Sequence, residues 1–389
     1  MHILLYHNDL ARLLCSSQNN PNKTGDHTLT CTHSCSLSYL SKSDTHLHFP
    51  FFFLLFFLLG LSPLRVAAQI GFPYCESFQT AGTQAATKFG GNAQLSPGVL
   101  RLTSNQVNQR GHVYLDISFP STYGLKAEFE YFSYGGTGWG PGVNSGDGFS
   151  VFLFDAETPV FNAGGFGGSL GYGPRDQEPG LSKAYLGIGF DEYGGFGTTA
   201  GGLNGSFPNQ PPTQLVPNSI VVRGPGNLFT GYPFVIGKKT MQDGPDGLSP
   251  DNQFPISSSS RVTDREKPGY RKVFLELQPN SNGPGFFIKL KMEVTTEPNK
   301  PRMVTIFNSP YSFIAPKNLK IGFAASTGGS TNFHEIRNLI VEVAAGESLR
   351  DPEGIDISDF SSCAGHNFRC CAIPVLTKST HAKSTAPIF

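Results

Sequence analysis

Apolar and polar residues alternate with a period of two along much of the chain. In LKAEFEY, residues 125–131, Leu125, Ala127 and Phe129 alternate with charged residues, and this spacing predicts a strand with one buried and one solvated face. The same alternation in FFIKLKMEV, residues 286–294, follows an Asn/Gly/Pro turn, so residues 273–294 are expected to form a β-hairpin. Further strands are expected at residues 98–103, 148–154, 185–190, 219–224, 319–326 and 336–343.

Helical periodicity is not sustained over any long segment, and turn residues separate the short strands. This pattern predicts an all-β fold, a β-sandwich of two antiparallel sheets over residues 69–345. Four glycine-rich stretches fall between the expected strands, where the loops of a sandwich carry binding sites: residues 135–148, 164–173, 194–205 and 224–231. Residues 346–389 are expected to be a polar tail without strand or helix pattern.

An apolar run from Phe51 to Leu61 precedes the predicted domain and is followed by small residues up to Ala68. The run is shorter than the roughly 20 apolar residues that span a bilayer, but it has the length of a signal-peptide core. Cleavage before Gln69 is therefore expected, which makes residues 1–68 a leader and the mature chain a secreted protein without a membrane insertion. An uncleaved signal anchor is the alternative. Residues 1–48 are polar and are expected to have no fold.

The charge and the cysteine content limit the kinds of partner that the protein binds and indicate the compartment in which it folds. The 389 residues include 29 Lys and Arg and 29 Asp and Glu, a formal net charge of 0 at pH 7, which excludes a basic surface for nucleic acid or anionic lipid. In an exported chain Cys75 is expected to pair with one of three C-terminal cysteines, and the spacing does not rank the pairings. A zinc site is disfavoured because the mature chain lacks CxxC pairs and histidines at ligand spacing. The mature cysteines are Cys75, Cys363, Cys370 and Cys371.

Several segments, taken in order over residues 72–343, resemble the L-type lectins, which have the concanavalin A-like jelly-roll fold, and most closely the bacterial secreted branch of that superfamily. The opening strands FGGNAQL and LRLTSNQVNQRGHVYL, and the closing LKIGFAASTGGSTNFHEIRNLIVEV, are similar to those of the family. Between them, SGDGFSVFLFD resembles the strand that presents a sugar-binding aspartate, GGSLGYG its glycine loop, and YLGIGFDEYGGF its metal-loop strand.

The resemblance implies a role for individual residues. Asp147 would accept hydrogen bonds from two sugar hydroxyls, and the backbone N–H of Gly168 would donate to the same sugar, since a glycine lets the backbone come close. Alternatively, Asp147 is only the first residue of an Asp-Gly turn. The loop with Gly328 and Gly329 would border the sugar or merely turn the chain, and Gly195 stands where the family places an asparagine that contacts both calcium and sugar.

The same resemblance implies a calcium ion, held by the carboxylate of Asp191 and the carbonyl of Tyr193. Calcium needs about six to eight oxygen ligands, and this chain departs from the family pattern here, with Gly189 in place of a glutamate and Gly195 in place of the asparagine. No transition metal is therefore expected. Asp191 is interpreted as the minimal core of a calcium loop or as a residue that caps the turn.

These observations predict a secreted, non-catalytic carbohydrate-binding protein whose partners are glycans or glycoproteins. The alternatives are a glycoside hydrolase of the same fold, or an adhesion or structural module that does not bind sugar. A hydrolase needs two carboxylates about 5–9 Å apart across the sugar, and Gly189 stands where the second would be. Asp191 and Glu192 are adjacent, so on a strand they face opposite sides. Trp139 and Tyr134 would stack on a sugar ring or pack in the protein.

Overall fold

The computed structural model describes residues 71–140 and 143–344. The expected leader, its apolar run at 51–61 and the expected cleavage point lie outside these residues, as do Cys363, Cys370 and Cys371. Within the described part, no helix is both long and apolar enough to cross a membrane.

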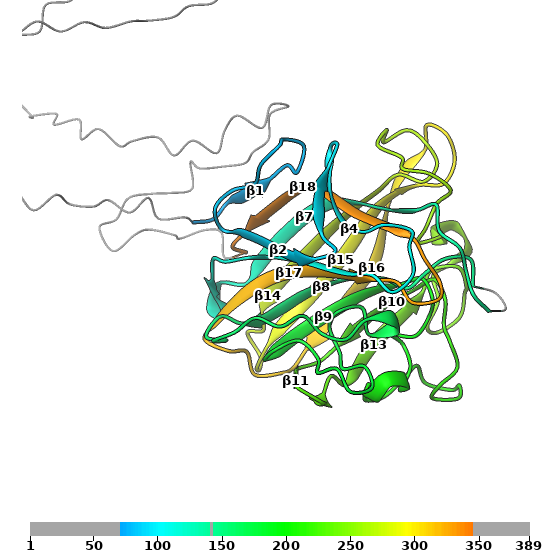
Figure 1. Cartoon of the computed structure of the whole chain (residues 1–389). Coiled ribbons are helices and arrows are strands. Elements are labelled where there is room, and N and C mark those ends of the chain that lie inside the picture. Colours follow the sequence, from blue (N-terminus) through cyan, green and yellow to red (C-terminus); the bar gives the residue numbers. More distant parts are fainter. Residues whose placement is uncertain (1–70, 141–142, 345–389) are drawn as a thin grey trace, which may run out of the picture. The chain divides into compact units, whose positions relative to one another are not determined.

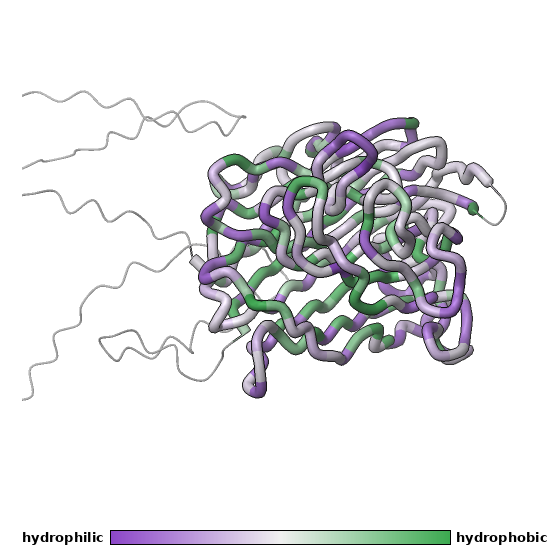
Figure 2. The backbone as a smooth tube through the Cα atoms, turned by 90° about the horizontal axis from the view of Figure 1, so that it is seen from below, coloured by the Kyte–Doolittle hydropathy of each residue, from purple (hydrophilic) through white to green (hydrophobic). Residues whose placement is uncertain are grey.

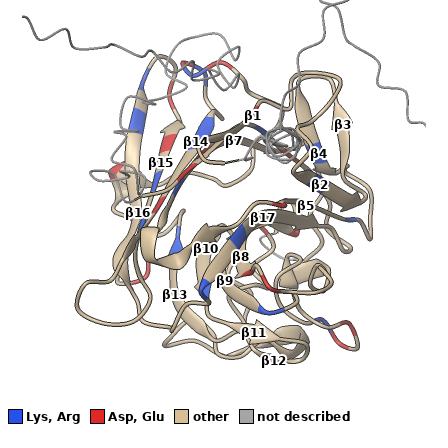
Figure 3. Ribbon diagram, turned by 90° about the vertical axis from the view of Figure 1, so that its left-hand side faces the viewer, with Lys and Arg blue, Asp and Glu red and all other residues tan. Residues whose placement is uncertain are grey.

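Two antiparallel sheets pack face to face, which confirms the fold class expected from the sequence (Figures 1 and 3). The eight-stranded sheet, here called sheet A, has the order β16-β15-β14-β7-β18-β4-β3, and β1 also pairs with β18. Its strands are β1 (Tyr74–Glu76), β3 (Gln94–Ser96), β4 (Val99–Thr103), β7 (Leu125–Tyr134), β14 (Arg271–Pro279), β15 (Phe286–Thr295), β16 (Pro301–Tyr311) and β18 (Phe333–Glu342).

The ten-stranded sheet, here called sheet B, has the order β12-β11-β9-β8-β17-β5-β2, with β10 paired to β9 and β13, and β6 paired to β17. Its strands are β2 (Thr87–Gly91), β5 (Arg110–Leu115), β6 (Phe119–Pro120), β8 (Gly148–Asp155), β9 (Ala184–Asp191), β10 (Ser219–Arg223), β11 (Gly226–Asn227), β12 (Thr230–Gly231), β13 (Phe234–Lys239) and β17 (Asn318–Ser326). The helical elements of the described part are short 3₁₀ turns, η1 (Ser121–Tyr123), η2 (Gly167–Ser169), η3 (Ala200–Gly202) and η4 (Pro250–Asn252).

The alternating positions of the strands form the core between the sheets. On β7, Leu125, Ala127 and Phe129 point inward and are buried, because period-two alternation places them on one face of sheet A. From sheet B, the rings of Phe149 and Phe190 stack with their centroids 4.4 Å apart. In Figure 2 hydrophobic segments run through the middle of the described part, and many of the outer loops are hydrophilic.

A second apolar layer covers the outer face of sheet B. There Phe152 of β8 joins Tyr172, Phe196 and Tyr232, which come from the loops and the short hairpin that follow the strands. Strand β9 is consequently buried along its whole length and β8 along nearly all of it. This burial on both faces explains why their sequences are almost continuously apolar instead of alternating.

Some strands were not predicted from the sequence. Strand β16 carries Pro301 and Pro310, which weaken a strand pattern but are tolerated because β16 forms an edge of sheet A. The glycine-rich stretch 224–231 lies between β10 and β13, and within it β11 and β12 form a small hairpin that was not predicted. The predicted hairpin at residues 273–294 is confirmed, with Leu275 opposite Leu290.

Candidate functional site

Asp147 lies directly before β8, where the ends of β9 and β17 meet on either side of it. Its backbone N–H donates to the carbonyl of Ser326 over 3.0 Å, and its own carbonyl accepts from the N–H groups of Glu192 and Tyr193 over 3.0 and 3.1 Å. The peptide bond between Gly146 and Asp147 is cis. Asp147 is thus held by backbone hydrogen bonds from two neighbouring segments.

The carboxylate of Asp147 is buried but incompletely paired. Its residue is 4% exposed, and Oδ2 accepts no hydrogen bond from the described residues. Burial raises its pKa to about 7, Arg175 lowers it and Glu192 raises it further. The amide of Gly328 is near enough to lower this pKa as well, although it donates its hydrogen bond to the carbonyl of Ser330 over 3.1 Å. A buried oxygen without a donor is costly, so a donor from a ligand would relieve it.

Glycines allow three loops to close around this carboxylate. A Cβ on Gly328 would lie 3.2 Å from Oδ2 of Asp147, and a Cβ on Gly168 would lie 3.0 Å from the Cα of Gly195. The hydroxyl of Ser326 donates to the carbonyl of Gly167 over 2.8 Å, which ties η2 to the end of β17. Any larger residue at Gly168 or Gly195 would push these loops apart.

Trp139 stands beside the same loops and is 71% exposed. Its backbone N–H donates to the hydroxyl of Ser330 over 2.8 Å, and a Cβ on Gly329 would lie 3.9 Å from Cγ of the indole. The interpretation of this tryptophan as a packing residue is therefore wrong. Tyr134 does pack, with its ring centroid 5.0 Å from that of Phe333.

The residues predicted for the site thus meet at one end of the sandwich. Hydrogen bonds, strand pairing and close backbone contacts connect them. They are Asp147, Gly168, Asp191, Tyr193, Gly195, Gly328 and Gly329.

Asp191 does not present a free carboxylate to a metal. It is fully buried; Oδ1 accepts from the N–H of Gly194 over 2.8 Å, and Oδ2 from the N–H of Gly197 over 3.2 Å. Burial raises the pKa of Asp191 to about 8, and this effect outweighs the backbone N–H donors, which lower the pKa. Asp191 therefore caps the glycine turn, the second of the two interpretations made from the sequence.

The donor set around Asp191 does not fit calcium. Tyr193 contributes only its carbonyl, and no group of three or more His, Cys, Asp or Glu side chains gathers anywhere in residues 71–140 and 143–344. A Cβ on Gly189 would lie 2.3 Å from the ring of Phe196, so this ring fills the space of the glutamate that the family places there. A Cβ on Gly195 would lie 2.9 Å from the Cα of Gly168. Hence neither departure from the family pattern leaves room for the missing ligand.

Glu192 faces the opposite way from Asp191, into the space between the sheets. It hydrogen-bonds to the hydroxyl of Ser133, to Nδ2 of Asn332 over 2.7 Å and to Nε2 of His334 over 3.1 Å. Burial by itself would raise the pKa of Glu192, but His334 and the hydroxyls of Ser133 and Ser145 hold it below its usual range. The other ring nitrogen of His334 lies 2.6 Å from the hydroxyl of Thr103. All members of this network are buried, and it connects the loop after β9 to strands of sheet A.

No role was predicted for Arg223 from the sequence, although an arginine that directly follows the apolar run SIVV indicates a charged residue at the end of a buried strand. It is fully buried at the end of β10, opposite Gly187 of β9. Its guanidinium donates to loop carbonyls that include those of Phe196 and Thr198. Phe196 lies within the turn that Asp191 caps, and Thr198 follows that turn directly.

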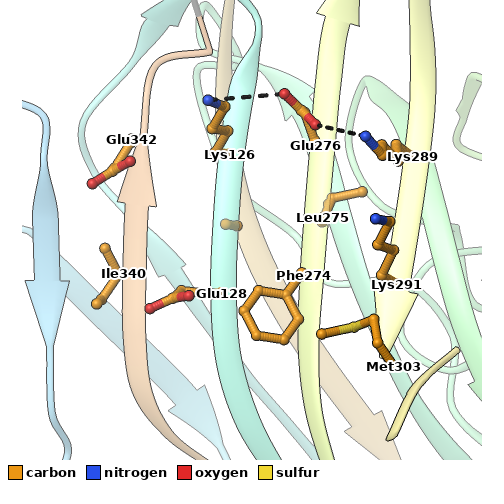
Figure 4. A pocket seen from close by; sticks show the side chains of 11 residues that line it. Lys126, Glu128, Phe274, Leu275, Glu276, Lys289, Lys291, Met303, Ile340 and Glu342 are labelled. Atoms are coloured by element: carbon orange, nitrogen blue, oxygen red, sulfur yellow. Dashed lines mark ion pairs between the residues drawn. The ribbon is translucent and has the colours of Figure 1, made fainter. Parts of the chain in front are cut away.

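A groove of about 530 Å³ lies elsewhere, on the outer face of sheet A (Figure 4). Its lysines and glutamates largely neutralise one another, as in the ladder from Lys126 through Glu276 to Lys289, with both ion pairs at 3.9 Å. None of the residues that line this groove carries a buried unpaired polar atom. The loop site around Asp147 is therefore the better candidate for specific binding.

No protein-family model matches the chain, and no curated protein sequence does either. Solved structures of L-type lectin domains are similar to it. The exoplasmic/lumenal domain of VIP36, in its Ca²⁺/Man3GlcNAc-bound form, is 14% identical over 70% of this chain and 89% of that chain, with a TM-score of 0.39. Peanut lectin is 18% identical over 69% and 95%, with a TM-score of 0.42. The carbohydrate recognition domain of Emp46p is 15% identical over 70% and 97%, with a TM-score of 0.41.

Proposed function

We propose that this protein binds glycans without transforming them, through the loops around Asp147. The observation that carries the proposal is the buried Oδ2 of Asp147, which accepts no hydrogen bond from the described residues. A sugar ring offers neighbouring hydroxyl donors, and a fixed carboxylate accepts two of them at once. The partners would be glycans or glycoproteins.

Two further features support a sugar as the ligand. Gly328 carries no side chain, and a Cβ there would lie 3.2 Å from Oδ2 of Asp147, so the backbone comes close to the carboxylate and a ligand can approach it. Trp139, which is exposed beside the loop of Gly329, offers an aromatic face to the apolar side of a sugar. The carboxylate would thus orient the ring, and the indole would add contact area.

A glycoside hydrolase of the same fold is the second candidate, and the carboxylates argue against it. Hydrolysis needs two acids that reach the same glycosidic bond. Both oxygens of Asp191 already accept backbone N–H groups, and Glu192 is buried in the network with His334. Neither Asp191 nor Glu192 is thus free to act as a second acid beside Asp147. A reducing-sugar release assay on glycans that the protein binds should remain at background.

The test of the binding proposal is Asp147→Asn. The amide replaces an acceptor with a donor, so the loss of a charge-assisted hydrogen bond should weaken binding by about 1.5–3 kcal/mol, or about 10- to 150-fold in Kd. Glycan arrays identify the ligand, and titration of the best ligand measures the change. Thermal stability should not fall and should rise above pH 7, since Oδ2 has no partner in the described residues to lose and the variant removes a buried charge whose pKa is raised by burial.

Asp155→Asn is the matched control. Asp155 ends the same strand β8 at its far end, where it pairs with Lys183 over 3.4 Å, so this variant should bind as the wild type does. Trp139→Ala should weaken binding without changing the unfolding temperature, because its side chain is largely exposed. If Asp147→Asn and wild type bind equally well, the glycan site does not lie at the end of the sandwich that carries Asp147, and the proposal is wrong.

Secretion is part of the same proposal. It is supported by the apolar run at residues 51–61 with the small residues before Gln69 and by Cys75, which is disulfide-bonded, a state typical of exported proteins. N-terminal sequencing of protein from a secreting host should map the mature end at or near Gln69. A membrane-embedded product that retains residues 1–60 would contradict cleavage.

A further inference from the structure

The loop that follows β9 folds back over the outer face of sheet B, and Arg223 lies beneath it. Val221 and Arg223 alternate with Ile220 and Val222, which face the core between the sheets. Arg223 consequently points outward, yet it is fully buried because the loop covers it. A buried cation is costly unless it is well paired.

All five N–H groups of the Arg223 guanidinium have a partner, and each partner is a backbone carbonyl. Nε donates to Phe196 over 2.8 Å. Nη1 donates to Asn204 over 2.8 Å and to Tyr232 over 2.7 Å. Nη2 donates to Thr198 over 2.6 Å and to Gly205 over 3.1 Å. A guanidinium has five donors, so its hydrogen-bonding capacity is fully used.

Asp191 and an aromatic ring lie near the charge of Arg223. Burial lowers its pKa to about 9, whereas the nearby carboxylate of Asp191 raises it. The ring of Phe196 lies with its centroid 5.4 Å from the guanidinium carbon, a cation–π distance. One cation therefore gathers five backbone carbonyl oxygens, and carbonyl oxygens are also ligands that a bound calcium ion uses.

This arrangement connects directly to the candidate site. The carbonyl of Thr198 accepts from Arg223, while the backbone N–H and the hydroxyl of Thr198 donate to the carbonyl of Gly195 over 3.1 and 2.8 Å. Gly195 in turn contacts the backbone of Gly168. The position of the glycine loop beside Asp147 thus depends on the segment that Arg223 holds.

We propose that Arg223 is a positioning residue that replaces a metal ion: its guanidinium organises residues 194–205, so that the binding site forms without calcium. The effect on sugar binding rests on the proposed function, whereas the effect on the loop does not. The same arrangement explains why Asp191 and Tyr193 fit calcium poorly, because carbonyl oxygens of this loop already accept hydrogen bonds from the guanidinium of Arg223.

The first experiment tests the metal. Wild-type protein is stripped with EDTA and compared with protein in calcium chloride, by hydrogen exchange of the amides of residues 194–205, by thermal unfolding and by titration with the best glycan from the array. All three measurements should be the same in both conditions. Slower exchange in this loop and a higher unfolding temperature with calcium would overturn the proposal, since a ligand that binds the folded state stabilises it.

The second experiment removes the guanidinium. Arg223→Lys retains a charge but offers three donors to five carbonyls, so amides of residues 194–205 should exchange about tenfold faster or more, and glycan binding should weaken. Arg223→Met should show a larger effect. Unchanged exchange in Arg223→Lys would overturn the proposal, and if Arg223→Met does not fold, the lysine variant and the calcium comparison still decide it.

Arg271→Met is the matched control for the loss of a buried arginine. Arg271 is 2% exposed, and its guanidinium also donates to backbone carbonyls, those of Pro255, Ser257 and Gly269. Exchange should accelerate around residues 255–257 in this variant and should stay slow in residues 194–205. If wild-type protein binds no glycan, the proposed function fails, but hydrogen exchange still tests the role of Arg223.

Discussion

At the scale of single residues, the environment of Asp147 sets when its carboxyl group can accept hydrogen bonds. Burial raises its pKa to about 7, with Glu192 raising it and Arg175 lowering it. The acceptor form therefore dominates only above neutral pH. Asp191, also buried with a raised pKa, is occupied by its own turn and does not replace Asp147 as an acceptor.

Glycan affinity should consequently fall as the pH drops through about 7. A protonated carboxyl has lost one acceptor position, so Kd should rise by up to about tenfold for each pH unit below the pKa. Titration calorimetry from pH 5 to pH 9 measures this dependence, with Asp147→Asn as the variant that should be weak and flat. An affinity that is constant or rises toward pH 5 would show that the ionised carboxylate is not the acceptor.

At the scale of elements, Glu192 and His334 connect the loop after β9 to sheet A. Glu192 hydrogen-bonds to Ser133 of β7 and to His334 of β18, and both side chains of the Glu192–His334 pair are 1% exposed. Because the partners come from separate strands, this network fixes the distance between the two sheets at the end that carries the site.

Glu192→Gln should destabilise the fold by about 3 kcal/mol, since removing one member of a buried pair leaves the other uncompensated. The pKa of Glu192 is lowered in the folded protein, so its contribution is present above the unfolded-state pKa and is lost as the pH falls through the lowered value. Denaturant unfolding at pH 7 measures the change. Glu276→Gln, at the partly exposed ladder of sheet A, should cost less than about 1 kcal/mol; equal losses would contradict a special role for Glu192.

At the scale of the whole molecule, Cys75 anchors the first strand. It lies in β1, opposite Ile340 of β18, and it is disulfide-bonded, whereas the other six cysteines of the chain lie outside the described residues. Pairing with Cys363, Cys370 or Cys371 remains the prediction from the sequence. It would link the two ends of the mature chain.

Mass mapping of non-reduced secreted protein should find Cys75 joined to one of those three cysteines. Cys75→Ser should cost about 2–4 kcal/mol, because the cross-link restricts the unfolded chain. A bond from Cys75 to Cys15, Cys31 or Cys35 would contradict both this pairing and cleavage before Gln69. A fully reduced Cys75 would contradict an oxidised secreted form.

The sequence determined the features that depend on local pattern. Alternation at Leu125, Ala127 and Phe129 was enough to predict strands and a sandwich, since period two assigns each side chain to a face. The glycine-rich turns likewise placed Asp147 and Gly328 on loops, where the structure has them. Strand β16 was not predicted, because its prolines are acceptable only at an edge, and the position of a strand in a sheet is not a local property.

Only the tertiary structure decided what the polar residues do. Asp191 ends a strand before a glycine turn, which left a metal ligand and a turn cap as two interpretations, and in the fold its oxygens accept from the N–H groups of Gly194 and Gly197. Arg223 ends an apolar strand, but carbonyls from residues 9 to 27 positions away in the chain converge on it. Hydrogen-bond partners depend on proximity in space among groups that are distant in sequence. The local pattern therefore placed the acids and glycines on their loops, and only the fold determined which backbone carbonyls the guanidinium of Arg223 holds.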